Sequence, residues 1–432
     1  MTQDPGSATP VGGPHALSFL LIAIFVDTLG FGIVIPVLPG LLTELSGGSL
    51  ADAAAWGGAL AFVFALMHLI FGPVLGNLSD RYGRRPVLLG SMAMLAVDYL
   101  IMASAGSLVW LFVGRLLTGV SAATFATANA YIADITPERD RAARFGLIGA
   151  AWGMGFVAGP ALGGLIGELG PRVPFLVAAA LAGANVLYGL LVLPETLAPE
   201  RRRPFQLSRA NPVGAFRALR GYPLVPPLFV AVILYFIAHD VNPSTWTYYV
   251  LHRFQWSTAE VGLALAAVGL SSAVVSGTLV GPVVRRFGEL QAATAGLVLS
   301  AVSFFGYAFA SADWMIFACI AVGAFMGLVM PALRGLLSRT LPAEQQGELQ
   351  GALSSLMGLT AIIAPVLMTQ TFSIFSAPDA RLAFPGASFF LAGCCALTAL
   401  LAVRYAGRRY AGRRHAGRLS PPESPRAPIR PD

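Results

Sequence analysis

Three carboxylic acids of this sequence lie inside long apolar segments, where an ionised side chain is costly. Asp27 and Asp98 lie midway along two such segments, and Asp240 lies in a third. A carboxylate at the centre of a membrane helix costs about 2.5–3.5 kcal/mol on insertion scales, so its presence suggests a function. A carboxylic acid in apolar surroundings can hold a proton or a cation and exchange one for the other. We therefore expect these three acids to handle a substrate and protons.

The alternative for each acid is a structural ion pair with a buried arginine such as Arg115 or Arg334. Arg115 lies in the segment Gly114-Arg-Leu-Leu-Thr-Gly119, which carries no other charge. A buried cation can couple protonation of a neighbouring acid to movement, or it can only neutralise that acid. Both interpretations stay open, and we group Arg115 with the acids as a candidate for substrate and proton coupling.

A dense cluster of charges follows the second apolar segment, in the stretch Gly76-Asn-Leu-Ser-Asp-Arg-Tyr-Gly-Arg-Arg85. Its glycine suits a turn, and the charges around it can form ion pairs between helices. Ion pairs that form in one conformation and break in another bias a two-state motion. We therefore predict a cytoplasmic gate formed by Asp80, Arg81, Gly83, Arg84 and Arg85. The alternative is that the arginines only anchor a loop on one side of a membrane.

The fifth apolar segment carries a run of glycines around a proline, from Gly153 to Gly167. Gly155, Gly159 and Gly163 are four residues apart, so on a helix they share one face and let another helix approach closely. Pro160 removes one backbone hydrogen bond and kinks a helix. We predict a hinge or tight seam between two halves of the protein at these four positions. The alternative is close packing alone.

The segments that position these residues imply a membrane protein. Of the 432 residues, 56% are hydrophobic and 11% are charged, and the mean hydropathy is +0.72. A soluble protein is about a quarter charged, so a soluble core is disfavoured. Stretches of about 20 apolar residues can cross a bilayer as helices. We predict an all-α membrane protein with twelve transmembrane helices, near residues 16–42, 56–76, 86–105, 108–132, 144–168, 174–193, 225–250, 258–282, 290–311, 313–338, 346–374 and 384–404.

Arginines divide unequally between the loops that join these spans. The sequence has no lysine, and the odd-numbered loops hold only Arg172, Arg253 and Arg381, while the even-numbered loops hold many arginines. Positively charged loops stay on the cytoplasmic side of a membrane. We therefore expect a multi-pass protein of the cytoplasmic (inner) membrane with both termini in the cytoplasm. This topology accounts for the net charge of +7, so no nucleic-acid partner is expected.

An internal repeat divides the spans into two groups of six. Glycines and prolines recur at a constant offset of 205 residues, in the pairs Gly76 and Gly281, Gly83 and Gly288, Pro137 and Pro342, Gly146 and Gly351, and Pro160 and Pro365. Parallel six-helix repeats are typical of transporters that hold a substrate between their halves. The second copy of the charged stretch, Gly281–Glu289, is degenerate, because Arg285 replaces its acid.

The repeat sets the predicted domain boundaries. We expect a disordered N-terminus (1–15), an N-terminal six-helix half (16–193), a cytoplasmic central loop (194–224), a C-terminal six-helix half (225–404) and a basic, proline-rich disordered tail (405–432). The tail repeats Tyr-Ala-Gly-Arg-Arg, which is a low-complexity pattern.

Sequence signatures of enzymes and metal sites are missing. A P-loop of the Gly-x4-Gly-Lys-Ser/Thr type is absent, which argues against ATP as the energy source. The five histidines are scattered, and Cys319, Cys394 and Cys395 lie in apolar segments without metal-ligand spacing. We expect no enzyme, no catalytic or metal-ligating residues and no resident cofactor.

At several motifs the chain resembles the major facilitator superfamily, and more closely its twelve-span tetracycline/proton antiporters, over residues 16–404. In the first half, these motifs are Asp27-Thr-Leu-Gly-Phe-Gly-Ile-Val-Ile-Pro-Val-Leu-Pro39, the Gly76–Arg85 stretch, Val97-Asp-Tyr99, Gly114–Gly119, Ala133-Asp-Ile-Thr136 and the glycines around Pro160. In the second half, they are Arg253-Phe-Gln-Trp256, Met330-Pro-Ala-Leu333 and Gln346-Gly-Glu-Leu-Gln-Gly351.

The resemblance implies export of a small-molecule drug, in the first place tetracycline as a divalent-metal chelate, in exchange for a proton. It assigns substrate and proton handling to Asp27 and Asp98. It also assigns a cytoplasmic gate to Asp80 and Arg84, and charge balance to Arg115. The metal would enter only as part of the substrate. By analogy of fold, the protein is expected to be a monomer in the lipid bilayer.

Two positions depart from that family. Its members carry an essential acid in the ninth span, where this chain has Ser300, and a histidine in the eighth, where it has Ser272. Conversely, Asp240 lies where the family tends to have glutamine, and our hypothesis is that it takes the coupling role of the missing acid. Two alternatives stay open: an exporter of another amphipathic drug or metabolite, and a transport-inactive receptor or scaffold. The three costly acids argue against the scaffold.

Overall fold

The computed structural model describes residues 14–122, 124–137, 140–202, 219 and 222–415. All regular secondary structure in these ranges is helical, and twelve helical segments are long and apolar enough to cross a membrane. Helices satisfy their backbone hydrogen bonds internally, as a bilayer requires. The predicted all-α membrane fold with twelve spans is confirmed. Most of the predicted N-terminal region 1–15, and much of the predicted central loop 194–224, lie outside the described residues.

The N-terminal half carries six spans. They are formed by α1 (Pro14–Val34), α3 (Leu50–Tyr82), α4 (Arg84–Ser104), α5 with α6 (Leu108–Ser121 and Thr124–Ile135), α7 (Arg141–Gly167) and α8 (Val173–Val192). A short helix, α2 (Leu38–Ser46), lies between the first two spans.

The C-terminal half also carries six spans. They are formed by α10 with α11 (Val225–His239 and Val241–Phe254), α12 with α13 (Thr258–Val274 and Val280–Phe287), α14 (Glu289–Phe309), α15 with α16 (Asp313–Gly323 and Val329–Thr340), α17 (Gln346–Ser376) and α18 (Ala387–His415). A π-helical turn (Val275–Leu279) joins α12 to α13, and a 3-10 turn (Ala324–Leu328) joins α15 to α16.

Prolines make the first span shorter than predicted. The sequence suggested one helix over 16–42, but α1 ends at Val34 and α2 follows after a turn. Pro36 has no N–H to donate, and a residue that precedes proline disfavours helical geometry. The chain turns tightly there, with the Val37 N–H donating to the Val34 carbonyl at 3.2 Å.

The last span is longer than predicted. The structure continues α18 to His415, so the predicted disorder of the 405–432 tail is wrong for residues 405–415. Alanine and arginine favour helices, and Gly407 lies close against the side chain of Leu290 on α14, which supports this part of the helix. Residues 416–432 lie outside the described residues.

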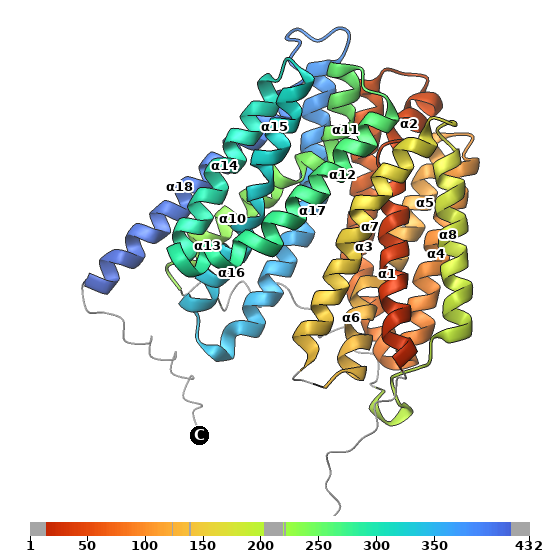
Figure 1. The fold of residues 1–432 in the computed structure, drawn as a ribbon, viewed down its shortest axis with the longest axis horizontal. Helices are drawn as coiled ribbons and strands as arrows, with labels where there is room; N and C mark the ends of the chain where they lie inside the picture. Colours follow the sequence, from red (N-terminus) through yellow and green to blue (C-terminus); the bar gives the residue numbers. More distant parts are fainter. Residues whose placement is uncertain (1–13, 123, 138–139, 203–218, 220–221, 416–432) are drawn as a thin grey trace, which may run out of the picture.

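Both halves repeat the same local structure, in agreement with the constant offset in the sequence. Gly83 and its counterpart Gly288 follow the second span of their halves and adopt positive φ angles of 112° and 81°. Glycine adopts such angles without the strain that a Cβ would add. The second span of each half also begins with a capping box, made by Ser49 at α3 and Ser257 at α12. Figure 1 shows the two halves as two bundles side by side.

The two bundles meet closely at one end, which we call the closed end (the upper end in Figure 1). There α7 packs along α12, and α3 packs along α17. Gly164 of α7 and Gly262 of α12 face each other, and a Cβ on either glycine would meet the backbone of the other helix. Small residues allow membrane helices to approach in this way. Between α7 and α12 the seal is therefore made by backbone at these two glycines.

At the opposite end, which we call the open end, the same helices separate. A Cβ added at Gly149 or Gly153 of α7, or at Gly351 of α17, would meet no atom of the described structure within 4 Å. The first turn of α1 and the last turn of α18 lie at this end (Figure 1). The halves thus diverge from the closed end towards the open end.

A carboxylate joins the two halves at the closed end. Glu168, just after α7, accepts hydrogen bonds at Oε1 from the Thr258 hydroxyl (2.8 Å) and the Ala259 N–H (3.1 Å) at the start of α12. These two hydrogen bonds lower the pKa of the Glu168 carboxyl from its ordinary value, and the bond from the Thr258 hydroxyl has the larger effect. A lowered pKa means that this contact favours the ionised form. Its stabilising effect is present above the ordinary pKa and is lost as the pH falls through the lowered value.

We predict that the Glu168 contact makes closure of this end sensitive to acid. Spin labels at the exposed ends of α5 (Val109) and α15 (Trp314) would report the distance between the halves. At pH 7, Glu168→Ala should increase the population with the longer distance several-fold, because α12 loses its acceptor. Wild-type protein should show the same change only below the ordinary titration range of a glutamate, about pH 4, because the pKa of Glu168 is lowered.

The matched control is Glu168→Gln, which keeps an acceptor oxygen and cannot titrate. It should stay closed at both pH values, which separates Glu168 from other carboxylates at this end, such as Glu44. Identical distance distributions for Glu168→Ala and wild type at pH 7 would contradict the assignment.

Candidate functional site

A large cavity of about 1700 Å³ lies between the two halves. It exceeds the usual range of small-molecule pockets, about 300–1000 Å³. Both halves line it, with polar or aromatic side chains that include Asp27, Phe31, Phe64, His68, Asn77, Arg115 and Trp152 from the first half and Asp240, Ser244, Thr247, Tyr248, Ser354 and Thr369 from the second. It reaches towards the open end at Asn77 and Gly351. Its wall is mainly apolar with a few polar groups, as in sites for drug-sized molecules.

Asp27 lies on the wall of this cavity, as its predicted role requires. It stands midway along α1 and is held from behind by Asn185 of α8, whose Nδ2 donates to Asp27 Oδ1 at 3.3 Å. The same amide nitrogen donates to the Ala23 carbonyl at 3.1 Å. Thr124 is a second neutral side chain beside the carboxyl group. Asp27 is thus held by neutral donors, and none of these partners is a cation.

Asp98 has a different environment, behind the cavity wall. Its side chain is fully buried, and Oδ2 lies 3.6 Å from Arg115 Nη1 and 3.3 Å from the Thr118 hydroxyl, which donates to it. A Cβ at Gly114 would collide with the Asp98 carboxyl, so this glycine makes room for it. Arg115 and Thr118 line the cavity, but Asp98 does not. The pair matches the ion-pair alternative, with Arg115 between the acid and the cavity.

Asp240 lies on the cavity wall of the second half, at the junction between α10 and α11. Its Oδ2 is buried, and no partner for it occurs among the described residues. By contrast, Ser300 lies buried in α14, where its hydroxyl donates to the Gly296 carbonyl at 2.7 Å, and it does not line the cavity. Of these two second-half positions, only Asp240 is placed to meet a ligand.

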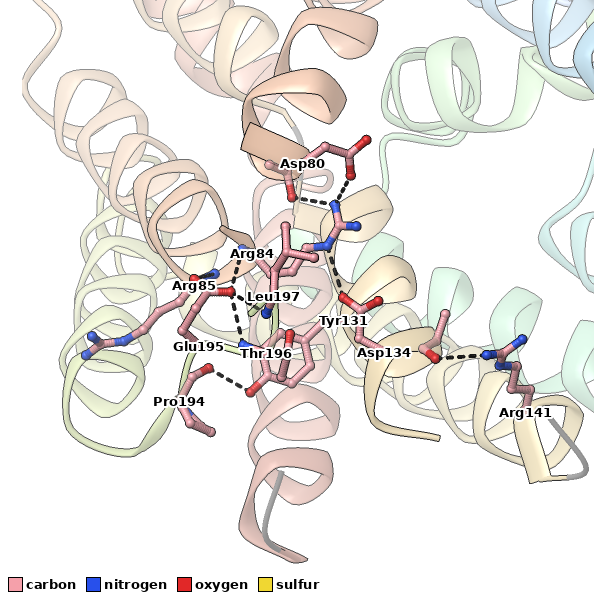
Figure 2. A network of polar contacts seen from close by, with 12 residues as sticks. Asp80, Arg84, Arg85, Tyr131, Asp134, Arg141, Pro194, Glu195, Thr196 and Leu197 are labelled. Atoms are coloured by element: carbon pink, nitrogen blue, oxygen red, sulfur yellow. Dashed lines mark hydrogen bonds and ion pairs between the residues drawn. The ribbon is translucent and has the colours of Figure 1, made fainter. Parts of the chain in front are cut away.

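The predicted gate residues lie at the open end of the N-terminal half, around Arg84 (Figure 2). Arg84 donates from Nη1 to Asp80 Oδ1 at 2.6 Å and from Nε to Asp134 Oδ2 at 3.1 Å, and so connects α3, α4 and α6. Charge-assisted bonds of this kind are roughly twice as strong as neutral ones. Arg81 does not join this network; its guanidinium lies over the ring of Tyr82, 5.2 Å from the centroid. The stretch predicted as a loop is helical up to Tyr82, and only Gly83 interrupts it.

Glu195 completes this network and was not predicted. Its carboxylate accepts from the backbone N–H groups of Arg84 (2.9 Å) and Arg85 (3.1 Å) at the first turn of α4 (Figure 2). An anion at a helix N-terminus satisfies N–H groups that have no partner within the helix. A Cβ at Gly83 would collide with the Glu195 carboxyl, so the glycine is needed for space as well as for its φ angle.

The C-terminal half carries the same ion pair with its charges exchanged. Arg339 of α16 pairs with Glu289 of α14 at 2.6 Å. At the offset of 205 residues, these two positions correspond to Asp134 and Arg84, and Arg285 corresponds to Asp80. The charges of Asp80, Arg84 and Asp134 are therefore inverted in the second half, whereas Arg81 keeps its charge as Arg286 and Arg85 corresponds to Leu290. The offset, applied to charged residues as well as to glycine and proline, could have revealed this pair from the sequence.

The predicted seam on α7 is wrong for three of its four residues. Gly155, Gly159 and Gly163 lie against α1 of the same half, where an added Cβ would meet the α1 backbone. They allow tight packing within the half, which was the alternative interpretation. Pro160 does reach the other half, through its carbonyl oxygen near Gly262, as does Gly164. Period-four spacing identified a close-packed face, but two faces of α7 carry glycine, and the pattern could not show which one meets α12.

No group of three or more His, Cys, Asp or Glu side chains within the described ranges is arranged as metal ligands would be. Asp134, Asn185 and Glu195 are polar partners that the sequence did not single out for a role. Asp134 belonged to a recognised motif, whereas Asn185 carried no signal beyond being a lone amide in an apolar span.

Comparison with known proteins adds to this geometry. The sequence profile of the Major Facilitator Superfamily matches residues 20–252 and 228–431. The chain is 42% identical over 359 residues to the class C tetracycline resistance protein of Escherichia coli, covering 83% of this chain and 90% of that protein. It is also 42% identical over 360 residues to the class G tetracycline resistance protein of Vibrio anguillarum, covering 82% and 89% of the two chains.

Solved structures share the fold. The nucleoside transporter NupG superposes with a TM-score of 0.74 at 13% identity, covering 91% of this chain and 99% of that chain. The human organic anion transporter MFSD10 (TETRAN) superposes with a TM-score of 0.64 at 23% identity, covering 90% and 100% of the two chains. At such identities the likeness concerns the fold alone.

We predict that Gly83→Ala destabilises the protein more than Gly288→Ala. Both substitutions strain a backbone that glycine alone adopts freely, at a cost of about 1–3 kcal/mol. Gly83→Ala also displaces Glu195 and removes charge-assisted hydrogen bonds, worth about 1.5–3 kcal/mol each. Gly288 faces only the flexible Gln291 side chain, at 3.3 Å from an added Cβ. Thermal unfolding of the purified variants measures the difference, and an equal decrease in Tm would contradict the space-making role of Gly83.

Proposed function

Because this chain belongs to the Major Facilitator Superfamily, in the group of the tetracycline resistance proteins, we propose that it exports a drug in exchange for protons. It is a multi-pass membrane transporter and not an enzyme. Our proposed drug is tetracycline, carried as a chelate with a divalent metal. The metal belongs to the substrate in this proposal, and no resident cofactor takes part.

One observation carries the proposal: the cavity between the halves has a carboxyl group from each of them on its wall, Asp27 and Asp240. Neither has a cationic partner in the described structure, in contrast to Asp98 with Arg115. A carboxyl group without a counterion can take up a proton when the cavity is empty and release it when a cationic substrate enters. In this scheme, Arg115 and Asp98 balance charge behind the wall, and Asp240 takes the second-half role for which Ser300 is unsuited.

We propose that the transporter works by alternating access, and the way the halves meet supports this. The described arginine-rich ends of α3 and α13 lie at the open end, and positively charged loops mark the cytoplasmic side. We therefore propose that the open end faces the cytoplasm, with both termini, and that the structure corresponds to a cytoplasm-facing state. Rocking of the halves would separate α7 from α12 and α3 from α17 and would open the cavity on the other side of the inner membrane.

The charged clusters at the open end suit this motion. When the open end closes, the cluster around Arg84 approaches its counterpart around Glu289. Two identical clusters brought together would place like charges opposite one another. Since the second cluster has inverted charges, Asp80 and Asp134 can approach Arg285 and Arg339 with attraction. The gate would then stabilise the closed cytoplasmic side.

A second candidate is export of another amphipathic drug by the same route. Ser272 and Ser300 favour it. The resemblance to tetracycline exporters implies a histidine and an acid at these two positions, and a different substrate would explain both departures. Receptor or scaffold function is not favoured, because the cavity contains acids that serve no packing purpose.

Uptake of labelled tetracycline with Mg²⁺ into inverted membrane vesicles tests the function. We expect uptake to depend on the proton gradient, and Asp27→Asn to remove at least nine-tenths of it, because an amide cannot exchange a proton for a cation. Asp379→Asn, on an exposed loop away from the cavity, is the matched control and should transport normally. Gradient-independent uptake would refute proton coupling. Uptake of another amphipathic drug but not of tetracycline would select the second candidate.

The gate assignment predicts that a substitution can slow transport without weakening drug binding. Asp80→Asn should lower turnover about tenfold or more and leave drug affinity nearly unchanged, because Asp80 lies outside the cavity and acts only when the open end closes. Turnover is measured in vesicles, and affinity by ligand-induced fluorescence changes of the purified protein. If both decrease equally and Tm decreases too, Asp80 is a structural residue and the gate assignment is wrong.

A further inference from the structure

A polar stripe runs from the junction of α10 and α11 along one face of α11 in the cavity wall. Asp240, Ser244 and Tyr248 are four residues apart, so they lie on one face of the helix, and all three line the cavity. At 1.5 Å per residue, the stripe is about 12 Å long, the length of a drug-sized molecule. It leads from the middle of the span to the closed end, where Gly57 of α3 leaves room for the Tyr248 hydroxyl.

Both ends of the stripe carry buried polar atoms without a partner. Asp240 Oδ2 and the Tyr248 hydroxyl have no hydrogen bond within the described ranges. Buried polar groups in proteins are nearly always hydrogen-bonded, and exceptions require an explanation such as a ligand. The two orphaned atoms belong to one helix face and one cavity, so a single ligand could satisfy both.

Pro243 adds an acceptor near Asp240. Proline has no N–H, so the His239 carbonyl lacks the amide four residues later that a helix would normally supply. The surrounding helical bonds are intact, since the Asp240 N–H donates to the Phe236 carbonyl and the Ser244 N–H donates to the Asp240 carbonyl, both at 3.1 Å. The sequence therefore frees one carbonyl beside the carboxyl group, and both are acceptors.

Cations are missing from this side of the cavity. Among the cavity-lining residues that the structure describes, the basic side chains are Arg115 and His68, and both belong to the N-terminal half. The second half contributes hydroxyl and apolar side chains around Asp240 and no positive charge. A carboxylate with further acceptors and no protein counterion suits a ligand that brings a positive charge and N–H donors of its own.

We propose that Asp240, Ser244 and Tyr248 form a subsite for a protonated amine of the transported compound. The ammonium group binds at Asp240, and an oxygen of the same compound meets the Tyr248 hydroxyl. This inference rests on the proposed export function and extends it, because it assigns substrate specificity to the second half. In tetracycline, the dimethylamino group carries such a charge and is separate from the oxygen atoms that chelate the metal. The stripe thus recognises a part of the drug that the metal does not occupy.

Two probes that differ in one group test the subsite. Binding of tetracycline with Mg²⁺, and of its analogue without the dimethylamino group, is measured on the purified full chain without a gradient, by quenching of tryptophan fluorescence. Trp152 on the cavity wall provides the signal. Asp240→Asn should weaken tetracycline binding at least tenfold and change analogue binding less than twofold. Asp379→Asn, on an exposed loop, should change neither.

Tyr248→Phe provides a second readout. It removes only the hydroxyl and keeps the ring, whose centroid lies 6.5 Å from the centroid of the Phe372 ring. Binding of both probes should weaken about three- to tenfold, because both retain the oxygen that meets the hydroxyl. Equal weakening of the two probes by Asp240→Asn, or no weakening of either, would overturn the subsite while leaving export in place.

Failure of the export proposal gives a different result. If wild-type protein binds neither tetracycline nor its analogue, the tetracycline assignment is wrong. Tetraphenylphosphonium, a lipophilic cation without hydrogen-bond donors, then tests the charge preference alone. Tenfold weaker binding to Asp240→Asn supports the cationic subsite, and unchanged binding overturns it.

Discussion

Backbone contact between the halves at one end is the constraint on which the rest of the structure depends. Gly164 and Gly262 bring α7 and α12 so close that neither position can hold a side chain. At the other end, α7 has open space around Gly149, and α17 has open space around Gly351. A pair of bundles joined at one end and separated at the other must enclose a wedge-shaped space. The cavity, its single direction of opening and the exposure of its acids all follow from that asymmetry.

Low dielectric surroundings then decide what each acid can do. Asp98 lies behind the wall and is compensated by Arg115, so that its charge is neutralised within the protein. Asp27 is held by Asn185, which orients the carboxyl group without adding a charge. Asp240 has an oxygen for which no partner occurs in the described part of the chain. Of the three acids, only Asp98 has a cationic partner in the described structure, and the two without one line the cavity.

The sequence predicted what depends on composition and local spacing. Hydropathy located the spans, and the constant offset predicted the duplicated turn at Gly83 and Gly288, because Gly and Pro report backbone geometry directly. Prediction from the sequence failed where contacts between helices decide which of two similar helix faces meets which neighbour. The spacing of Gly155, Gly159 and Gly163 indicates a packed face, but only the arrangement of helices shows that α1 occupies it.

Long-range contacts escaped prediction for the same reason. Glu195 is separated from Arg84 by 111 residues, and nothing in the short Pro-Glu-Thr segment indicates that it binds a helix N-terminus. The end of α1 was different. Pro36 was visible in the sequence, and its effect on the helix could have been predicted from proline chemistry alone.

The exchanged charges of the two clusters have a consequence for how the chain is assembled. Each half contains an ion pair between the same two positions, with the acid and the arginine exchanged. The exchange therefore leaves the attraction within each half unchanged. Across the molecule, however, the halves have become as distinct as the subunits of a heterodimer. Two copies of the first half placed in this arrangement would set acid against acid and arginine against arginine. The two halves therefore form a matched pair, in which each half favours the other over a copy of itself.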